Sequence, residues 1–192
     1  MVEICVNSYI EGKWQINETK KTHFLSPIDG AKLSQVANSD ISGEEILNFS
    51  RKHGVESLQE LNFHQRAKII KQIALLLDKN KDGLYKLSHL TGATLNDSFL
   101  DIDGGIATLL VLASKVRKEM EEGFIGIDGD TEMLSRNGTF LGQHIFSPLK
   151  GVVVHINAFN FPIWGMLEKL TCSLLAGVPT IIKASASTSF LT

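Results

Sequence analysis

Cysteine is scarce in this sequence, and neither sign of charge is in excess. The two cysteines among the 192 residues, Cys5 and Cys172, lie far apart, which fits a reduced cytoplasmic protein better than one held by disulfides. The 19 basic and 21 acidic side chains leave a formal net charge of −2, so nothing favours binding to nucleic acid or to a membrane surface. The first ten residues contain no basic segment of the kind that opens a signal peptide.

Long apolar runs, internal repeats and low-complexity segments are missing as well. The longest apolar candidate, Gly105–Ala113, is far too short for a membrane-spanning helix, which needs about 20 residues. A composition of 43% hydrophobic and 21% charged residues argues against disorder. The length is enough for one folded core.

A strand–helix–strand pattern near the C-terminal end organises the chain. Val152–Ile156 is a β-branched apolar run that predicts a strand buried on both faces. Pro162 stands where a first helical residue is expected, and Gly177 stands where the helix should stop. Val178–Lys183 predicts a second strand, so the whole pattern predicts a βαβ unit. Between the strands, apolar side chains recur at helical spacing: Ile163, Met166, Leu167, Leu170, Leu174 and Leu175.

Two groups of residues directly follow these strands, where α/β proteins bind their ligands. Asn157–Asn160 offers backbone N–H groups and a helix N-terminus, which suit an anion. Lys183–Ser185 offers a positive charge and a hydroxyl group. The residue pattern alone is consistent both with a nucleotide or phosphate site and with a βαβ unit that is only scaffold.

The first half of the chain predicts ribbons followed by helices. Ser8–Gln15 and His23–Ala37 each predict a hairpin without a role in chemistry. Ser42 and a glutamate three residues later predict a capping box, which opens a helix that ends near Gly54. A second cap at Asn62 opens a long helix that stops at the Thr-Gly pair of residues 91 and 92.

A third helix and a hairpin complete the predicted elements. The helix is expected over Leu95–Met120, weakened in its middle by Gly104–Gly105. Thr131–Ser147 predicts a hairpin around Asn137–Gly138, a pair typical of a type I′ turn. No metal site is expected, because the spacing of the helical histidines fits no common ligand set. These histidines are His53, His64 and His89.

Four motifs of the βαβ unit carry a resemblance to a known family. They are Ile156–Pro162 (Ile-Asn-Ala-Phe-Asn-Phe-Pro), Lys169, Ala176–Gly177 and Ile182–Ser185. Together they resemble the NAD(P)-dependent aldehyde dehydrogenase superfamily, whose usual versions read Pro-Trp-Asn-Phe-Pro and Lys-Pro-Ser-Glu. The variant over His155–Lys169 resembles the branch that acts on CoA-thioester semialdehydes from the breakdown of phenylacetate and benzoate.

The resemblance implies an α/β fold in which residues 1–192 are the N-terminal part of a cofactor-binding domain. It implies an incomplete Rossmann-like parallel sheet, N-terminal β-ribbons, helices and an oligomerisation hairpin over residues 131–147. That hairpin would reach a neighbouring subunit, so a homo-oligomer is expected. The alternative is a hairpin that packs on its own domain.

The resemblance also implies roles for individual residues. Asn160 matches the asparagine that stabilises the oxyanion formed when a thiolate adds to the aldehyde. The alternative is an asparagine that only caps the helix before Pro162. Lys169 matches a lysine near the general base, and the alternative is a solvated charge. We interpret His155 as a buried, hydrogen-bonded histidine rather than a catalyst.

The cofactor predicted from the resemblance is NADP, with NAD as the alternative. Lys183 matches the lysine that binds the adenine ribose, and Ala186 stands where a glutamate usually accepts from the ribose 2′-OH. Without that carboxylate, Lys183, Ser185 and Ser187 are available to a 2′-phosphate. The predicted cofactor-binding residues are Ile156, Asn157, Ala158, Phe159, Lys183, Ser185 and Ala186.

The activity implied is oxidation of a CoA-thioester semialdehyde to the acid. In the superfamily the cysteine nucleophile and the glutamate base lie downstream of the Lys183 motif, and neither Cys5 nor Cys172 matches that nucleophile. We therefore expect an N-terminal fragment that is inactive alone and that self-associates through uncovered strand edges and apolar surface. The alternative is a non-catalytic module that binds a nucleotide or another protein.

Overall fold

The computed structural model describes residues 3–16, 21–37 and 42–192. The strands are β1 (Ile4–Val6), β2 (Ser8–Ile10), β3 (Lys13–Gln15), β4 (Lys21–Leu25), β5 (Lys32–Ala37), β6 (Gly126–Met133), β7 (Leu141–Phe146), β8 (Val153–Ile156) and β9 (Thr180–Lys183). The helices are α1 (Gly43–Phe49), α2 (Val55–Gln59), α3 (Phe63–His89), α4 (Leu95–Glu119) and α5 (Trp164–Leu175), with a π-helical turn η1 (Ser50–Gly54) and a 3-10 turn η2 (Ala186–Thr188).

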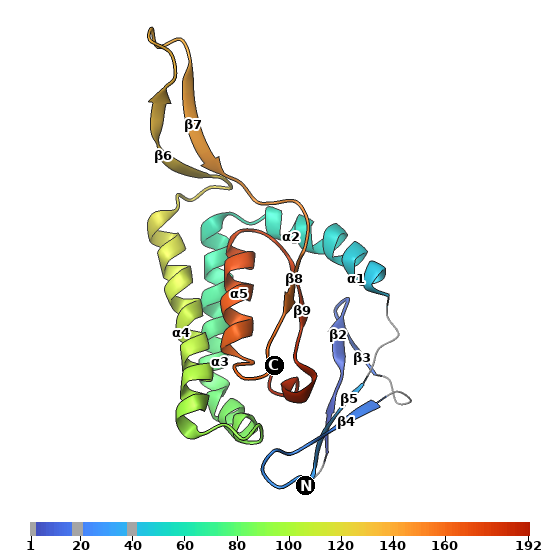
Figure 1. Cartoon of the computed structure of the whole chain (residues 1–192). Coiled ribbons are helices and arrows are strands. Elements are labelled where there is room, and N and C mark those ends of the chain that lie inside the picture. Colours follow the sequence, from blue (N-terminus) through green and yellow to red (C-terminus); the bar gives the residue numbers. More distant parts are fainter. Residues whose placement is uncertain (1–2, 17–20, 38–41) are drawn as a thin grey trace.

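These elements form an α/β fold in which α3, α4 and α5 stand side by side (Figure 1). Strands β8 and β9 lie beside α5, and the N-terminal ribbons lie beyond them. The hairpin of β6 and β7 projects from one end of the helices. None of the helices in the described ranges is long and apolar enough to cross a membrane.

Both predicted N-terminal hairpins are confirmed. Strands β2 and β3 pair antiparallel with Tyr9 opposite Trp14, and the rings of this cross-strand pair meet edge to face at 5.1 Å. Glu11 and Gly12 both have positive φ, 54° and 75°, as a type I′ turn requires. Strands β4 and β5 also pair antiparallel, but β5 has a second, parallel partner in β1, which the sequence pattern did not predict.

The first predicted helix does not end at Gly54. Ser42 caps α1 by accepting a hydrogen bond from the amide of Glu44, and the helix continues through η1 into α2. A Cβ on Gly54 would lie 2.7 Å from the Cβ of Pro179. The glycine therefore permits a close approach to the start of β9 and does not terminate the helix.

The two long helices begin with capping boxes. At the start of α3, the side chains of Asn62 and Gln65 each accept a hydrogen bond of 2.8 Å from the backbone amide of the other residue, as predicted. Helix α4 is continuous through Gly104–Gly105, which was predicted to weaken it. A Cβ on Gly105 would lie 3.1 Å from the Cα of Trp164. The pair of glycines lets α5 approach α4 closely.

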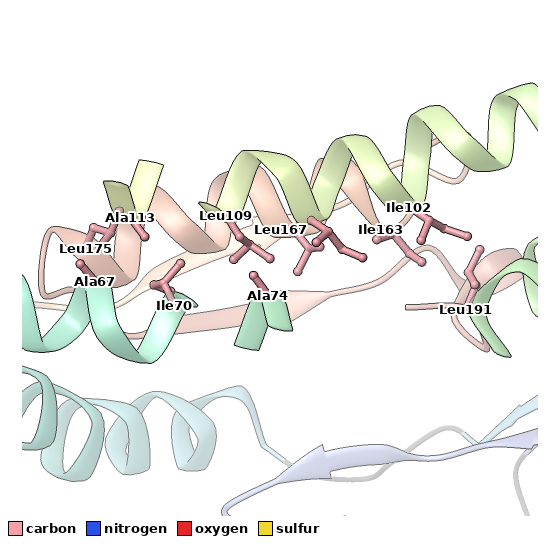
Figure 2. Packing of buried hydrophobic residues seen from close by; sticks show 11 residues of the cluster. Ala67, Ile70, Ala74, Ile102, Leu109, Ala113, Ile163, Leu167, Leu175 and Leu191 are labelled. Carbon is pink, nitrogen blue, oxygen red and sulfur yellow. The ribbon is translucent and has the colours of Figure 1, made fainter. Parts of the chain in front are cut away.

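The hydrophobic core lies between α3, α4 and α5 (Figure 2). Ile70 of α3 and Leu109 of α4 are completely buried, and Leu167 of α5 is 2% exposed. Leu191, which follows η2, reaches into the same core. The core thus ties the crossover helix of the βαβ unit to the two helices that precede it in the sequence.

The βαβ unit is present, but β8 is covered on one face only. Strands β8 and β9 pair in parallel, with Val153 opposite Thr180 and Ile156 opposite Lys183. His155 is buried, whereas Val154 and Ile156 are 53% and 75% exposed, so the prediction of a strand buried on both faces is wrong. Among the described residues, helix α5 covers one face of β8, and β9 is its one strand partner.

Helix α5 has the predicted end and a later start. Its first helical residue is Trp164, two positions after Pro162. Gly177 has a φ of 79°, and the amides of Gly177 and Val178 donate to the carbonyls of Leu174 and Ser173. This is a Schellman termination, which depends on a left-handed residue at Gly177.

The predicted hairpin is confirmed with different bounds and a different turn. Strand β6 begins at Gly126 rather than near Thr131. Asn137 does not have the positive φ that a type I′ turn needs, and the strands close where the amide of Leu134 donates to the carbonyl of Phe140. The hairpin extends away from the helices (Figure 1), so the alternative in which it packs on its own domain is wrong.

Candidate functional site

The loops that follow β8 and β9 lie side by side. The parallel register places Ile156 opposite Lys183, and the amide of Asn157 donates to the carbonyl of Lys183 at 3.0 Å. The structure thus brings together the two groups of residues that sequence reasoning assigned to one site. Ala158 and Phe159 are exposed beyond this bond.

Asn160 has a free side chain at the tip of this arrangement. The residue is exposed, and its amide makes no hydrogen bond to any described residue. Helix α5 is not capped by Asn160, because the N-cap position is Ile163 and a different side chain binds the first amides. The alternative of a capping asparagine is therefore wrong, and the amide is available as a donor.

Lys169 is directed back towards the end of β8. Its Nζ donates to the carbonyl of Ile156 at 3.3 Å, so the charge is held beside the loop rather than free in solvent. The positive charge also acts on the neighbouring His155. Burial, and then Lys169, lower the pKa of His155 below its usual value.

His155 is a neutral, buried ring on the helix side of β8. It is 6% exposed, and its Nε2 lies 3.2 Å from the hydroxyl of Ser173 on α5. The lowered pKa agrees with a ring that stays uncharged at neutral pH. These contacts agree with the interpretation of a structural histidine.

The N-terminus of α5 is already occupied by a carboxylate of the chain. Asp101 of α4 accepts from the amide of Trp164 at 2.7 Å and from that of Ile163 at 3.1 Å. The residue is 3% exposed, and burial raises its pKa against the lowering effect of the two amides. The expectation that this helix N-terminus receives an anionic ligand is therefore wrong.

Sequence reasoning missed Asp101 because its partners lie 62 and 63 positions further along the chain. A signal was present: Asp101 falls beside Ile102 on the stripe of α4 that also carries Gly105 and Leu109, all of them buried. A carboxylate on a buried stripe needs a partner.

The second half of the candidate site surrounds Lys183. Its side chain is exposed and borders an open hollow of about 1180 Å³ between β9 and the N-terminal ribbons. Ala186 also lines this hollow, whereas the loop with Asn160 does not. The hydroxyls of Ser185 and Ser187 lie 3.3 Å apart. No acidic residue occurs between Lys183 and the last residue of the sequence.

This donor set fits the adenosine end of a dinucleotide. Lys183 supplies a cation, and the hydroxyls of Ser185 and Ser187 supply hydrogen-bond donors and acceptors. A phosphate on the ribose meets no carboxylate of residues 183–192 that would repel it. No cluster of three metal-binding side chains occurs in the described ranges.

Two further polar side chains are buried, and of these only Asn157 was predicted as a site residue. Asn157 is 6% exposed, and neither atom of its amide has a hydrogen-bond partner among the described residues. Arg66 of α3 is 2% exposed, and its guanidinium is likewise without such a partner. Its charge lies 4.8 Å above the ring of Phe63, and burial lowers its pKa.

The fold is α/β, and the candidate site lies at the carboxyl ends of its parallel strands, where α/β proteins bind their ligands. The model of the aldehyde dehydrogenase family matches residues 14–192. The chain belongs to this family. A 3,4-dehydroadipyl-CoA semialdehyde dehydrogenase from Aromatoleum evansii is 35% identical over 96% of this chain and 36% of that protein.

Solved structures agree on the fold. An indole-3-acetaldehyde dehydrogenase from P. syringae, solved with NAD+ and IAA, has a TM-score of 0.78 at 24% identity, over 97% of this chain and 37% of that one. A 3,6-anhydro-L-galactose dehydrogenase in complex with NAP has a TM-score of 0.77 at 21% identity, over 97% of this chain and 38% of that one. The chain spans about a third of the length of the curated relatives it matches.

Proposed function

We propose that this chain is the N-terminal part of the cofactor-binding domain of an NADP-dependent aldehyde dehydrogenase. The observation that supports this most is the free amide of Asn160 on a loop that is bonded to the Lys183 end of β9. The proposed substrate is a CoA-thioester semialdehyde from aromatic breakdown. The 35% identity to the Aromatoleum evansii protein supports this substrate, and so does the resemblance of the loop variant over His155–Lys169 to the CoA-semialdehyde branch. The two free cysteines agree with a cytoplasmic location.

In this reaction a cysteine thiolate adds to the aldehyde carbon, and the carbonyl oxygen becomes an oxyanion. The side-chain N–H of Asn160 would donate to that oxygen, and no hydrogen bond to a described residue has to break first. A bound dinucleotide would supply the hydride acceptor. Lys183 and the hydroxyls of Ser185 and Ser187 would hold its ribose and phosphate end.

The nucleophile and the base come from outside these 192 residues in this proposal. Cys5 lies in β1 and Cys172 lies in α5, and both are exposed free thiols. Neither stands on the loop with Asn160. We therefore propose that the chain alone does not oxidise aldehydes, and that Lys169 acts by holding the carbonyl of Ile156 and the end of β8.

The test is a chimera that joins this chain to the remaining part of the Aromatoleum evansii relative. We expect NADPH formation with 3,4-dehydroadipyl-CoA semialdehyde and none with the chain alone. Asn160→Ala should lower kcat by about a hundredfold or more, as loss of one oxyanion donor does elsewhere. Asn160→Asp is the matched variant, since it keeps the shape and removes the donor. An active Asn160→Ala chimera would refute the assigned role.

Cofactor choice has a separate test. Ala186→Glu places a carboxylate where it repels a 2′-phosphate and accepts from a 2′-OH. We expect the ratio of kcat/KM for NADP to that for NAD to fall by about tenfold or more, which is the effect of about 1.4 kcal/mol. Ala107→Glu, at an exposed position of α4 outside the hollow, is the control. A wild-type chimera with a tenfold preference for NAD would refute the NADP assignment.

The projecting hairpin supports a homo-oligomer. Several of its apolar side chains are more than half exposed within the described parts of the chain: Ile127, Met133, Leu141, Ile145 and Phe146. Exposed apolar surface of this extent marks an interaction site. We infer that a second copy of the chain covers it. The same exposure favours the second candidate function, a protein-interaction module without catalysis, which an inactive chimera that still self-associates would support.

A further inference from the structure

The carboxylate of Asp101 joins two elements that are distant in the sequence at the point where the Asn160 loop ends. Asp101 lies in the first half of α4, and its oxygens accept from the amides of Ile163 and Trp164. The neighbouring Ile102 faces Ile163 in the core (Figure 2). Two adjacent backbone groups are thus fixed to one side chain that is itself packed between helices.

The loop between β8 and α5 is therefore held at both ends. At the first end, the amide of Asn157 is bonded to the carbonyl of Lys183. At the second end, Asp101 holds Ile163 and Trp164. The exposed residues between these ends include Asn160, whose amide makes no bond to a described residue. The position of that amide depends on the two anchors.

Stability alone does not explain a carboxylate at this place. The two amide bonds favour the charged form, but burial outweighs them and leaves the pKa of Asp101 raised. The oxygen Oδ1 accepts from both amides, at 3.1 Å from Ile163 and 2.7 Å from Trp164, and Oδ2 also accepts from the amide of Ile163 at 3.3 Å. A neutral asparagine of the same shape would keep one such oxygen without the cost of a buried charge. What the carboxylate adds is the third bond, which fixes the direction of the first turn of α5.

The packing of Trp164 supports the same arrangement. The indole lies against Gly104, where a Cβ would be 3.3 Å from a ring carbon, and the Cα of Trp164 lies 3.1 Å from where a Cβ on Gly105 would be. The backbone of Trp164 is held by Asp101 and packs on Gly105, and its ring packs on Gly104. The start of α5 has little freedom to shift along α4.

We propose that Asp101 is a positioning residue for the aldehyde dehydrogenase reaction, and that it sets the place of the Asn160 amide relative to the ends of β8 and β9. This inference rests on the proposed function in one respect, the role of Asn160. The contact between Asp101 and α5 itself does not depend on that role. The two parts are therefore tested by different measurements.

The first measurement is amide hydrogen exchange of the chain, followed over the segment of residues 157–164. Asp101→Ala removes both acceptors, and we expect exchange in this segment to accelerate by about tenfold or more, as loss of a helix cap does. Asp101→Asn keeps one acceptor oxygen and should restore most of the protection. If Asp101→Ala does not fold, Asp101→Asn compared with Asp101→Ser provides the same contrast.

Asp103 provides the matched control on the same helix. Its carboxylate bonds the hydroxyl of Tyr85 and the ammonium of Lys81 on α3, so Asp103→Ala perturbs α4 without touching α5. We expect unchanged exchange in residues 157–164. Equal acceleration by Asp101→Ala and Asp103→Ala would overturn the inference, because it would show general loosening of the helices.

The second measurement is made on the chimera described above. Asp101→Ala should lower kcat by about tenfold or more while the KM for NADP changes less than about twofold, and Asp101→Asn should recover part of kcat. Faster exchange together with an unchanged kcat would overturn the positioning role. If Asp101→Ala accelerates exchange in residues 157–164 but the wild-type chimera is inactive, the Asp101 anchor is supported and the proposed function is refuted.

Discussion

Gly177 and Arg66 provide a sharp test of how tightly α3 and α5 are packed. A Cβ added at Gly177 would overlap Nη1 of Arg66 and lie 3.1 Å from its Cζ. Arg66 has nowhere to move, because it is 2% exposed and lies on the ring of Phe63. The third neighbour, the Cβ of Pro148 at 3.2 Å, closes the other side.

The magnitude expected for Gly177→Ala has two parts. A left-handed φ of 79° costs an alanine about 1 kcal/mol, and overpacking against a side chain that cannot move costs about 1–3 kcal/mol. We therefore expect the free energy of unfolding to fall by about 2–4 kcal/mol. Gly30→Ala is the control, because its φ of 72° is similar and nothing lies within 4 Å of its Cβ. That substitution should cost about 1 kcal/mol.

The assay is urea denaturation, which gives the free energy of unfolding of the wild-type chain, of Gly177→Ala, of Arg66→Met and of the double variant. Arg66→Met keeps most of the packed volume and removes a buried guanidinium that has no hydrogen-bond partner among the described residues, so we expect it to cost little or to stabilise. In that background Gly177→Ala should cost only about 1 kcal/mol. Equal costs for Gly177→Ala and Gly30→Ala, or no coupling in the cycle, would refute the reasoning.

Two further predictions concern pH and association. Because burial and Lys169 lower the pKa of His155 from 6.5, its contribution to stability is present above about pH 6.5 and is lost as pH falls through the lowered value. Denaturation at several pH values should show this loss in the wild-type chain and a smaller one in His155→Gln. For the hairpin, Ile127→Glu with Ile145→Glu should weaken self-association in sedimentation, whereas Val111→Glu on an equally exposed site of α4 should not. A hairpin variant that associates like the wild type would show that the interface lies elsewhere.

Local signals in the sequence predicted much of the fold. Asn62 and Gln65 capped a helix because both bonds of a capping box are made within four residues. Gly177 ended α5 because a left-handed residue is a local requirement. The adjacency of the Asn157 and Lys183 loops followed from the parallel pairing that any βαβ unit adopts.

What the sequence pattern did not predict depends on partners far along the chain. Gly54 was predicted to end a helix, but a glycine is needed there because Pro179 packs against it. The apolar residues of β8 predicted a strand buried on both faces, but burial depends on what packs on each face, and Val154 and Ile156 are open in the described chain. Asp101 could be recognised as unusual from its place in an apolar stripe, but not as the anchor of α5.

The three-helix core has a consequence for the order of events during synthesis. Helices α3 and α4 are consecutive, with five residues between them, whereas β6, β7 and β8 lie between α4 and α5. Closing such a short connection costs little chain entropy. The ribbons of β2 to β5 leave the ribosome before these helices, but isolated ribbons of this size are marginal in water. We expect the ribbons to stay unfolded until the helices have assembled, so that they become native after segments that are made later.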